Sequence, residues 1–285
     1  MKEKILILYS GGLDSYILFH WTKITYPDSE IKCIYYDYGN PICETEKKFL
    51  PEFVEVRSID WFKNSTESLV GKIGESHKGN IYIPGRNLVF SILSACQELP
   101  DYIFMGGLYE ECHVNATDKN ITFIEKTSDI LNYVLQPFKE KIQIKFPFVD
   151  SKMTKLDIMK WAVDFGITFD ELEQKTISCF KQNDFYMPCG ECHSCMRTFS
   201  FFQHWNHDVK FLHHPFLESD FGRTYILNSI TQLENSNYNK YLLYDIDYES
   251  IAEYLKKNKE NLSWVTDNVL DKLTTIVHEK QSAEL

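Results

Sequence analysis

The chain has 285 residues, of which 44% are hydrophobic, and it carries a net charge of −11. This length is enough for one large domain, or for one domain with an appendage. The acidic balance argues against non-specific nucleic-acid binding as the main role, because such binding needs a basic surface, but it does not exclude a local basic site. No apolar run is long enough to span a membrane, and the N-terminus has a strand pattern rather than that of a signal peptide. We therefore expect a cytoplasmic protein.

The first half of the chain alternates short apolar runs with helical patterns, which is typical of an α/β fold with a parallel sheet. Thr154 and Asp157 form a capping-box pattern, and Gly166 is expected to end the helix that follows. The polar stretch 63–80 is expected to be a loop or a broken helix. Strands are expected over 4–9, 31–36, 53–56, 102–105 and 142–146, and helices over 13–24, 42–50, 87–97, 121–136 and 154–165.

The composition changes near residue 216. The stretch 216–285 holds seven Lys and Arg against twelve Asp and Glu, with one Gly and no Pro. Its apolar spacing predicts helices over 249–259 and 262–281, with an exposed turn at 233–240. We therefore expect three parts, 1–170, 171–215 and an acidic helical extension over 216–285, which is either a docking surface or a solvated helical cap.

The string SGGLDS, residues 10–15, interrupts a buried strand and opens a helix. Glycines at this point let the backbone approach a phosphate, and the N–H groups of the helix N-terminus favour an anion. Ser10 and Ser15 add hydroxyl groups, and Asp14 either holds Mg²⁺ or orients the loop. No Lys follows the second glycine, so the loop is not of the GxxxxGK[ST] type. A tight turn is the alternative interpretation.

Four cysteines, Cys179, Cys189, Cys192 and Cys195, are spaced Cys-x9-Cys-x2-Cys-x2-Cys. Four thiolates suit a closed tetrahedral Zn²⁺ site of structural type, and Gly190 would ease the tight turn between ligands. An iron–sulfur cluster and a redox thiol pair are the alternatives.

The remaining cysteines and the histidines near the cluster are expected to bind no metal. Cys33, Cys43, Cys96 and Cys112 lie in apolar or loop segments, where cysteine usually behaves as a small buried hydrophobe. His193 lies inside the cluster, where Cys195 already supplies a fourth ligand. His204 and His207 are expected at the surface or in the core.

SGGLDS resembles the PP-loop of the N-type ATP pyrophosphatases, which activate an oxygen as an AMP adduct and then substitute it. Together with the cysteine pattern it resembles the 7-cyano-7-deazaguanine synthases of the queuosine pathway. YYDYG (35–39), YIPGRNLVFSILSA (82–95) and the segment 146–167 are similar to further segments of that family. The resemblance covers about residues 4–200 and implies a Rossmann-like nucleotide-binding domain followed by a helical zinc-binding region.

The resemblance implies an ATP-dependent ligase that adenylates a 7-deazaguanine carboxylate, which ammonia or another amine then attacks. Ser10, Asp14, Ser15 and Arg86 are the implied catalytic residues. Arg86 would hold the carboxylate in a bidentate manner, with a structural ion pair as the alternative. ATP, Mg²⁺ and Zn²⁺ are the implied cofactors, and a homodimer is expected. The implied nucleotide and substrate residues are Ser10, Gly11, Gly12, Leu13, Asp14, Ser15, Asp37, Tyr38, Arg86, Asn87, Gly106 and Gly107.

The chain departs from the family pattern at two segments. After the second strand it has Asn40-Pro41-Ile42 where the family has Gln-Arg-His, and the YPDCR segment is absent after the fourth strand. Cys112, Asn115 and Asp118 are candidates to replace that segment. A divergent member is therefore expected, which either stops at the amide or joins the deazapurine to another amine, including a protein amine in an anti-phage system.

Two other functions remain open from the sequence. A tRNA-modifying PP-loop enzyme of the thiolating type would need a basic face, which the acidic total disfavours. A non-catalytic nucleotide-binding scaffold would not need an intact SGGLDS and PGRN.

Overall fold

A computed structural model describes residues 2–40, 42–59, 85–112, 118–179, 185–234 and 246–283. The chain forms two compact units, Met1–Ile177 and Ser178–Leu285, which we call unit 1 and unit 2. The predicted loop at 63–80 and most of the predicted turn at 233–240 lie outside the described residues. The division into three functional parts stays a prediction.

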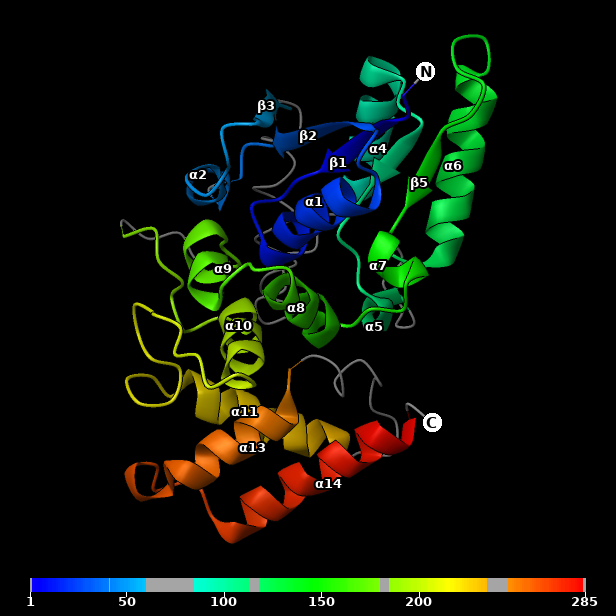
Figure 1. The fold of residues 1–285 in the computed structure, drawn as a ribbon. Helices are drawn as coiled ribbons and strands as arrows, with labels where there is room; N and C mark the ends of the chain where they lie inside the picture. The colour runs from blue at the N-terminus through cyan, green and yellow to red at the C-terminus, as the bar shows by residue number, and fades with distance from the viewer. Residues whose placement is uncertain are drawn as a thin grey trace. The chain divides into compact units, whose positions relative to one another are not determined.

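Unit 1 is built on a parallel sheet, as the alternating pattern predicted (Figure 1). The strand order is β3-β2-β1-β4-β5, and every neighbouring pair is parallel. The strands are β1 (Lys4–Leu8), β2 (Glu30–Asp37), β3 (Val54–Ser58), β4 (Tyr102–Phe104) and β5 (Gln143–Lys145).

Strand β1 lies at the centre of the sheet, with Ile7 opposite Cys33 of β2 and Phe104 of β4. From β1 the chain builds outward first through β2 and β3, and later through β4 and β5. The order of connection therefore reverses between β1 and β4. In open α/β sheets such a reversal leaves a crevice at the carboxyl ends of the two strands, where ligands bind.

Helices cover both faces of this sheet. Tyr35 and Tyr36 are consecutive on β2, so their side chains point to opposite faces. The hydroxyl of Tyr35 reaches Glu46 of α2, and that of Tyr36 reaches Ser94 of α4. The helices of unit 1 are α1 (Leu13–Thr25), α2 (Ile42–Lys47), α4 (Arg86–Glu98), α5 (Tyr109–Cys112), α6 (Ile121–Leu135), α7 (Pro147–Asp150), α8 (Lys155–Asp164) and α9 (Phe169–Lys175).

The ends of α8 confirm the predicted capping signals. The Thr154 side chain accepts a hydrogen bond from the Asp157 N–H, and the Asp157 side chain accepts one from the Thr154 N–H. Gly166 has φ +89°, and its N–H donates to the carbonyl of Val163. At both ends of α8, backbone groups thus find hydrogen-bond partners among residues next to them in the sequence.

Unit 2 is helical in the residues described, with helices α10 (His193–Gln203), α11 (Phe221–Leu233), α13 (Tyr248–Lys257) and α14 (Asp267–Ala283), and a 3₁₀ turn at Lys259–Asn261. These helices share one apolar core, which includes Phe199, Ile230, Tyr248 and Leu273. Within the described ranges, no helix combines the length and the apolarity that a bilayer span requires.

The predicted helix 262–281 is wrong at its start. Leu262 and Val265 are buried in the core as expected, but they precede the helix. Thr266 accepts a hydrogen bond from the Val269 N–H, as an N-cap side chain does. The helix therefore begins at Asp267 rather than at the first apolar residue.

Candidate nucleotide site and metal centre

The loop between β1 and α1 takes the turn that SGGLDS predicts. Gly11 has φ +75°, a conformation that residues with a Cβ rarely adopt, and Gly12 is the N-cap of α1 with extended backbone. A Cβ on Gly11 would lie 3.3 Å from the carbonyl oxygen of Glu46. No side chain caps α1 at Gly12, so the N-terminal backbone N–H groups are available to an anion.

The two serines of the loop hold its backbone in place. The Ser15 hydroxyl donates to the Gly12 carbonyl at 2.8 Å and accepts from the Ser10 N–H at 3.2 Å. The Ser10 hydroxyl lies 3.2 Å from that of Ser15. Ser15 is buried, whereas Ser10 is exposed. We infer that Ser15 shapes the loop and that Ser10 is the hydroxyl more accessible to a ligand.

A basic side chain that the sequence did not indicate lies at this loop. The Lys155 ammonium binds the carboxylate of Asp14 in the first turn of α1. Lys155 is the first residue of α8, and its backbone N–H donates to the buried carboxylate of Glu110 at 2.9 Å. Its side chain is 13% exposed. The loop therefore has a lysine, although none follows its glycines in the sequence.

Gly106 and Gly107 follow β4, beside the same loop. A Cβ on Gly106 would lie 3.2 Å from Cβ of Asp14 and 3.4 Å from the backbone N of Ser15. A Cβ on Gly107 would lie 2.3 Å from the ring of Phe146. Both glycines therefore have a packing role, and Gly106 brings the end of β4 against the N-terminus of α1 at the reversal point of the sheet.

Asp37 and Tyr38 follow the end of β2. The Asp37 carboxylate accepts hydrogen bonds from the Gly39 N–H at 3.0 Å and from Lys47 Nζ at 2.7 Å. Burial acts to raise the pKa of Asp37, but these bonds outweigh it and hold the pKa below its usual value. Tyr38 is buried, and burial raises the pKa of its phenol far above the usual value. Asp37 is therefore ionised and Tyr38 neutral near pH 7.

Arg86 and Asn87 start α4 next to these groups. The Arg86 guanidinium lies over the ring of Tyr38, with Cζ 5.9 Å from the ring centroid. The Asn87 side chain donates to the carbonyl of Asp118 at 3.2 Å. Asp118 is thus next to the PGRN segment, as its candidate role requires, whereas Cys112 is buried and donates to the carbonyl of Lys119. Asn115 and residues 82–84 lie outside the described part of the chain.

No motif in the sequence marks Glu46, yet its carboxylate binds a buried side chain of β2. It accepts the hydroxyl of Tyr35 at 2.6 Å. Burial raises the pKa of Glu46 to about 7, although the Tyr35 hydrogen bond and the charge of Arg86 act in the opposite direction. Glu46 belongs to a polar helix segment without a motif, so only its position in the fold distinguishes it from its neighbours.

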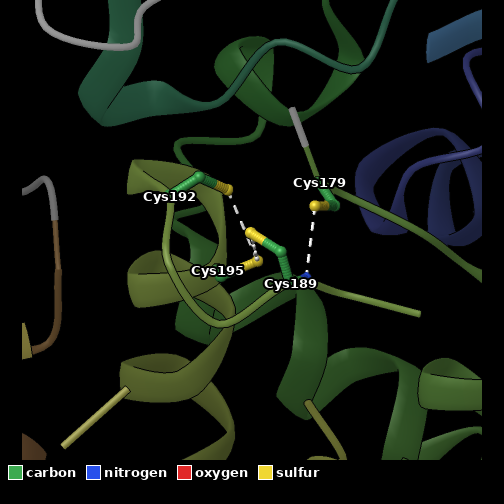
Figure 2. Close-up of side chains that lie close together, drawn as sticks. All are labelled: Cys179, Cys189, Cys192 and Cys195. Carbon is green, nitrogen blue, oxygen red and sulfur yellow. Dashed lines mark hydrogen bonds between the residues drawn. The ribbon is translucent and has the colours of Figure 1, made fainter. Parts of the chain in front are cut away.

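The four clustered cysteines of unit 2 lie together (Figure 2). All four are buried, none is in a disulfide, and their Sγ atoms lie within 4.8 Å of one another. The Sγ–Sγ distance is 3.8 Å for Cys189 and Cys195, and 3.4 Å for Cys192 and Cys195. A tetrahedral site with metal–sulfur bonds of about 2.3 Å has sulfurs about 3.8 Å apart. The geometry therefore fits one metal ion.

The surroundings of the cluster also fit a metal. The backbone N–H groups of Cys189 and Glu191 donate to the sulfurs of Cys179 and Cys189 at 3.3 Å and 3.2 Å. Gly190 has φ +75°, and a Cβ there would lie 1.6 Å from the carbonyl oxygen of His213. Hydrogen bonds from the neighbouring sulfurs lower the pKa of Cys179, whereas the same neighbours raise that of Cys195. Four thiolates therefore need a cation to coexist here.

The other cysteines and histidines differ in their surroundings. Cys33 and Cys43 are buried as expected, but Cys96 is exposed, because it lies on the outer side of α4. His193 contacts the ring of Tyr225, with centroids 5.7 Å apart. His204 pairs through Nδ1 with the buried carboxylate of Asp247 at 2.9 Å. The imidazole of His204 is thus bound by a side chain of the same chain.

Comparison with known proteins places both sites within one family. The family described as Queuosine biosynthesis protein QueC matches residues 4–206, which include the SGGLDS loop and all four clustered cysteines. The chain belongs to the QueC family. The resemblance inferred from the sequence is thereby confirmed.

Two QueC relatives illustrate how far this chain has diverged. A 7-cyano-7-deazaguanine synthase of Pyrococcus furiosus is 27% identical in an alignment 233 positions long, which covers 69% of this chain and 91% of the relative. A 7-cyano-7-deazaguanine synthase of Prochlorococcus marinus is 28% identical in an alignment 223 positions long, which covers 72% of this chain and 95% of the relative. The alignments therefore cover nearly the full length of both relatives.

Among solved structures, the U34-tRNA thiolase NcsA from Methanococcus maripaludis, described with its [4Fe-4S] cluster, aligns with a TM-score of 0.39 and 15% identity. The alignment covers 65% of this chain and 63% of the thiolase. The QueC match ends at residue 206, so α11, α13 and α14 lie beyond the matched region.

Proposed function

We propose that this QueC-family chain uses ATP to adenylate a 7-deazaguanine carboxylate and then transfers the acyl group to an amine, so that it acts as a carbon–nitrogen ligase. One observation carries the proposal most strongly. The glycine loop at the α1 N-terminus has Lys155 and Asp14 beside it, and it lies at the reversal point of a parallel sheet. Such a crevice is where α/β proteins bind nucleotides.

The loop is proposed to hold the β- and γ-phosphates, which leave as pyrophosphate. The backbone N–H groups after Gly11 and Gly12, the Ser10 hydroxyl and the Lys155 ammonium would stabilise the negative charge that develops on the leaving group. Asp14 would hold Mg²⁺, which supplies further charge neutralisation at the phosphates. Because Lys155 binds Asp14 directly, we propose that Lys155 turns from Asp14 to a phosphate oxygen when nucleotide binds.

Asp37 and Tyr38 are proposed to contact the nucleoside half of ATP. The end of the second strand is where related sheets bind a ribose. The ionised Asp37 carboxylate accepts two hydrogen bonds within the protein, and a carboxylate has about four acceptor positions. It therefore retains capacity for a ribose hydroxyl.

Arg86 is proposed to bind the carboxylate that becomes activated. Its guanidinium can hold both oxygens and orient one of them toward the α-phosphorus. Attack of that oxygen forms the acyl-adenylate and breaks the bond to pyrophosphate. An amine then adds at the acyl carbon, and AMP leaves with the electron pair of the broken C–O bond. With ammonia the product is an amide and one proton is released.

The relatives are named for a nitrile product. A nitrile requires a second activation, this time of the amide oxygen. This chain has Asn40 where the family pattern has a Gln and lacks the Arg and His that follow it, so the amide is the first product to seek. Joining the deazapurine to a protein amine remains a prediction.

The cysteine cluster is proposed to hold a structural Zn²⁺. The sulfur separations match a single tetrahedral ion. In a [4Fe–4S] cluster each thiolate binds a different iron atom, and in a [2Fe–2S] cluster the four thiolates are divided between two irons, so some of the sulfurs stand farther apart than those around a single ion. Four thiolates also leave no open position for catalysis, which favours a role in folding unit 2.

The test is product analysis. The purified chain is incubated with 7-carboxy-7-deazaguanine, Mg-ATP and ammonium, and products are identified by mass spectrometry while AMP and pyrophosphate are quantified. We expect AMP and pyrophosphate in equal amounts, dependent on the acid, and a product with the mass of the amide or the nitrile. Ser10→Ala and Arg86→Gln should each reduce the rate at least tenfold. Absence of adenylate, amide and nitrile under these conditions would overturn the proposal.

A further inference from the structure

Glu110 contacts the helix from which Lys155 extends, and it does so from the segment that follows β4. Its carboxylate accepts the backbone N–H of Lys155, the first residue of α8, at 2.9 Å. Glu110 is buried, with 6% of its surface exposed. This carboxylate has no part in the nucleotide or substrate contacts proposed above.

A second hydrogen bond joins the same two segments. The N–H of Tyr109, the first residue of α5, donates to the carbonyl of Met153 at 3.1 Å. Adjacent residues of α5 thus hold two points of the chain that leads into α8, one on each side of Thr154. The backbone of Lys155 is therefore fixed from α5, independently of where its side chain reaches.

The same segment also lies against the nucleotide loop. Gly106 precedes Glu110 on the segment, and it packs so closely on Asp14 that a Cβ on this glycine would be 3.2 Å from the Asp14 Cβ. Asp14 is the residue whose carboxylate binds the Lys155 ammonium. The segment 106–110 therefore contacts both partners of this ion pair, the aspartate from one end and the lysine from the other.

The position of the lysine backbone matters because of the movement proposed for its side chain. Lysine carries its ammonium on a flexible stem, so rotation about that stem can take the ammonium of Lys155 from Asp14 to a phosphate oxygen. The ammonium reaches the phosphate reliably only if the backbone at its base stays in place. The first N–H of a helix has no partner within the helix, and a carboxylate that accepts it is also favoured by the helix dipole.

We propose that Glu110 is a positioning residue, which fixes the backbone of Lys155 so that its ammonium reaches the phosphates of bound ATP. The inference rests on the proposed function, because it takes Lys155 as a phosphate ligand. Glu110 acts through the lysine and not through a contact of its own with the nucleotide. Its contribution to nucleotide affinity should therefore disappear when the side chain of Lys155 loses its charge.

The test is a double-mutant cycle on nucleotide affinity. Titration calorimetry with α,β-methylene ATP and Mg²⁺ compares the full-length wild-type chain with Glu110→Met, Lys155→Gln and the double variant. Methionine keeps the length of the side chain but has no oxygen to accept the N–H. Glu110→Met should weaken binding about fivefold in the wild-type chain and by less than about twofold in the Lys155→Gln chain, because effects of coupled residues do not add.

Three further variants separate positioning from other roles. Glu110→Gln retains an oxygen on a side chain of the same length and should bind nucleotide like the wild-type chain, whereas a Mg²⁺ ligand would not tolerate the loss of charge. Glu110→Asp keeps the charge on a shorter side chain and should lose affinity, which keeps the test open if Glu110→Met does not fold. Asp157→Ala removes a carboxylate that caps the same helix end and, as the matched structural control, should keep the wild-type affinity.

The outcomes separate this inference from the proposed function. If Glu110→Met or Lys155→Gln binds like the wild-type chain, or if their losses multiply in the double variant, the inference is wrong and the proposed function stands. The same conclusion follows if Glu110→Gln binds as weakly as Glu110→Met, or if Asp157→Ala loses as much affinity. If the wild-type chain does not bind the nucleotide, both are contradicted.

Discussion

Lys155 binds the carboxylate of Asp14 although 141 residues separate them in the sequence. The contact joins the first residue of α8 to the first turn of α1. Many phosphate-binding loops carry their lysine directly after the glycines. Here the fold supplies a lysine from a distant helix, so the loop has a positive charge without the corresponding motif.

The first prediction concerns this lysine. Lys155→Gln should weaken binding of α,β-methylene ATP by about tenfold, or about 1.4 kcal/mol. The loop would lose one charge-assisted contact to phosphate, and Asp14 would face the phosphates without its counter-ion. Titration calorimetry in the presence of Mg²⁺ measures the effect.

Lys160→Gln is the matched control, because Lys160 lies on the same helix in an exposed pair with Asp164. It should bind the nucleotide like the wild-type chain. Equal affinity of Lys155→Gln and the wild-type chain would show that Lys155 only stabilises the apo loop.

The second prediction concerns Gly107. Gly107→Ala should destabilise the fold by about 2–3 kcal/mol, because the added methyl group would overlap the fully buried ring of Phe146. Gly85→Ala is the comparison: Gly85 has φ +74° but open space around its Cβ position, so only the backbone strain of about 1 kcal/mol is expected. Urea unfolding measures both. A smaller loss for Gly107→Ala than for Gly85→Ala would contradict the packing argument.

Sequence periodicity predicted the sheet of unit 1 well, because strands buried on both faces read as continuous apolar runs, as in Lys4–Leu8. Local capping signals at Thr154 and Asp157 were equally informative. Helix α11 was missed, although Ile226, Ile230 and Leu233 have helical spacing. Apart from Leu227, the residues between these three positions are polar, and the side chains that bury the three come from other helices of the unit 2 core.

Site residues were predictable where one short segment contains all the groups that would bind the ligand or the metal. SGGLDS and the cysteine spacing are of this kind. Lys155 and Glu46 were not predictable, because each acquires its role from a contact across the fold: Lys155 with Asp14, and Glu46 with Tyr35. No local pattern marks a single charged residue on a short amphipathic helix.

The third prediction concerns the cysteine cluster. Elemental analysis of the purified chain should find one zinc per chain and no stoichiometric iron. Cys192→Ser should lose the metal and destabilise unit 2, because binding of a structural metal contributes directly to folding. Cys96→Ser, at an exposed cysteine outside the cluster, should retain both metal and stability. Stoichiometric iron in protein purified without oxygen would contradict the zinc assignment.

The last prediction concerns the pH dependence of stability. The pKa of Glu46 is raised to about 7 in the folded chain, against about 4.3 when unfolded. Between these values the folded state binds more protons than the unfolded state, so this group makes stability fall as pH rises from about 4 to 7. Glu46→Gln cannot ionise. It should match the wild-type chain near pH 4 and be more stable by about 3–4 kcal/mol at pH 8. Urea unfolding from pH 4 to pH 8 measures this difference, with Glu52→Gln, at an exposed residue of the turn before β3, as a control that should show none. A difference that does not change with pH would mean that the pKa of Glu46 is the same in the folded and unfolded chain, so that Tyr35 and Arg86 fully compensate its burial.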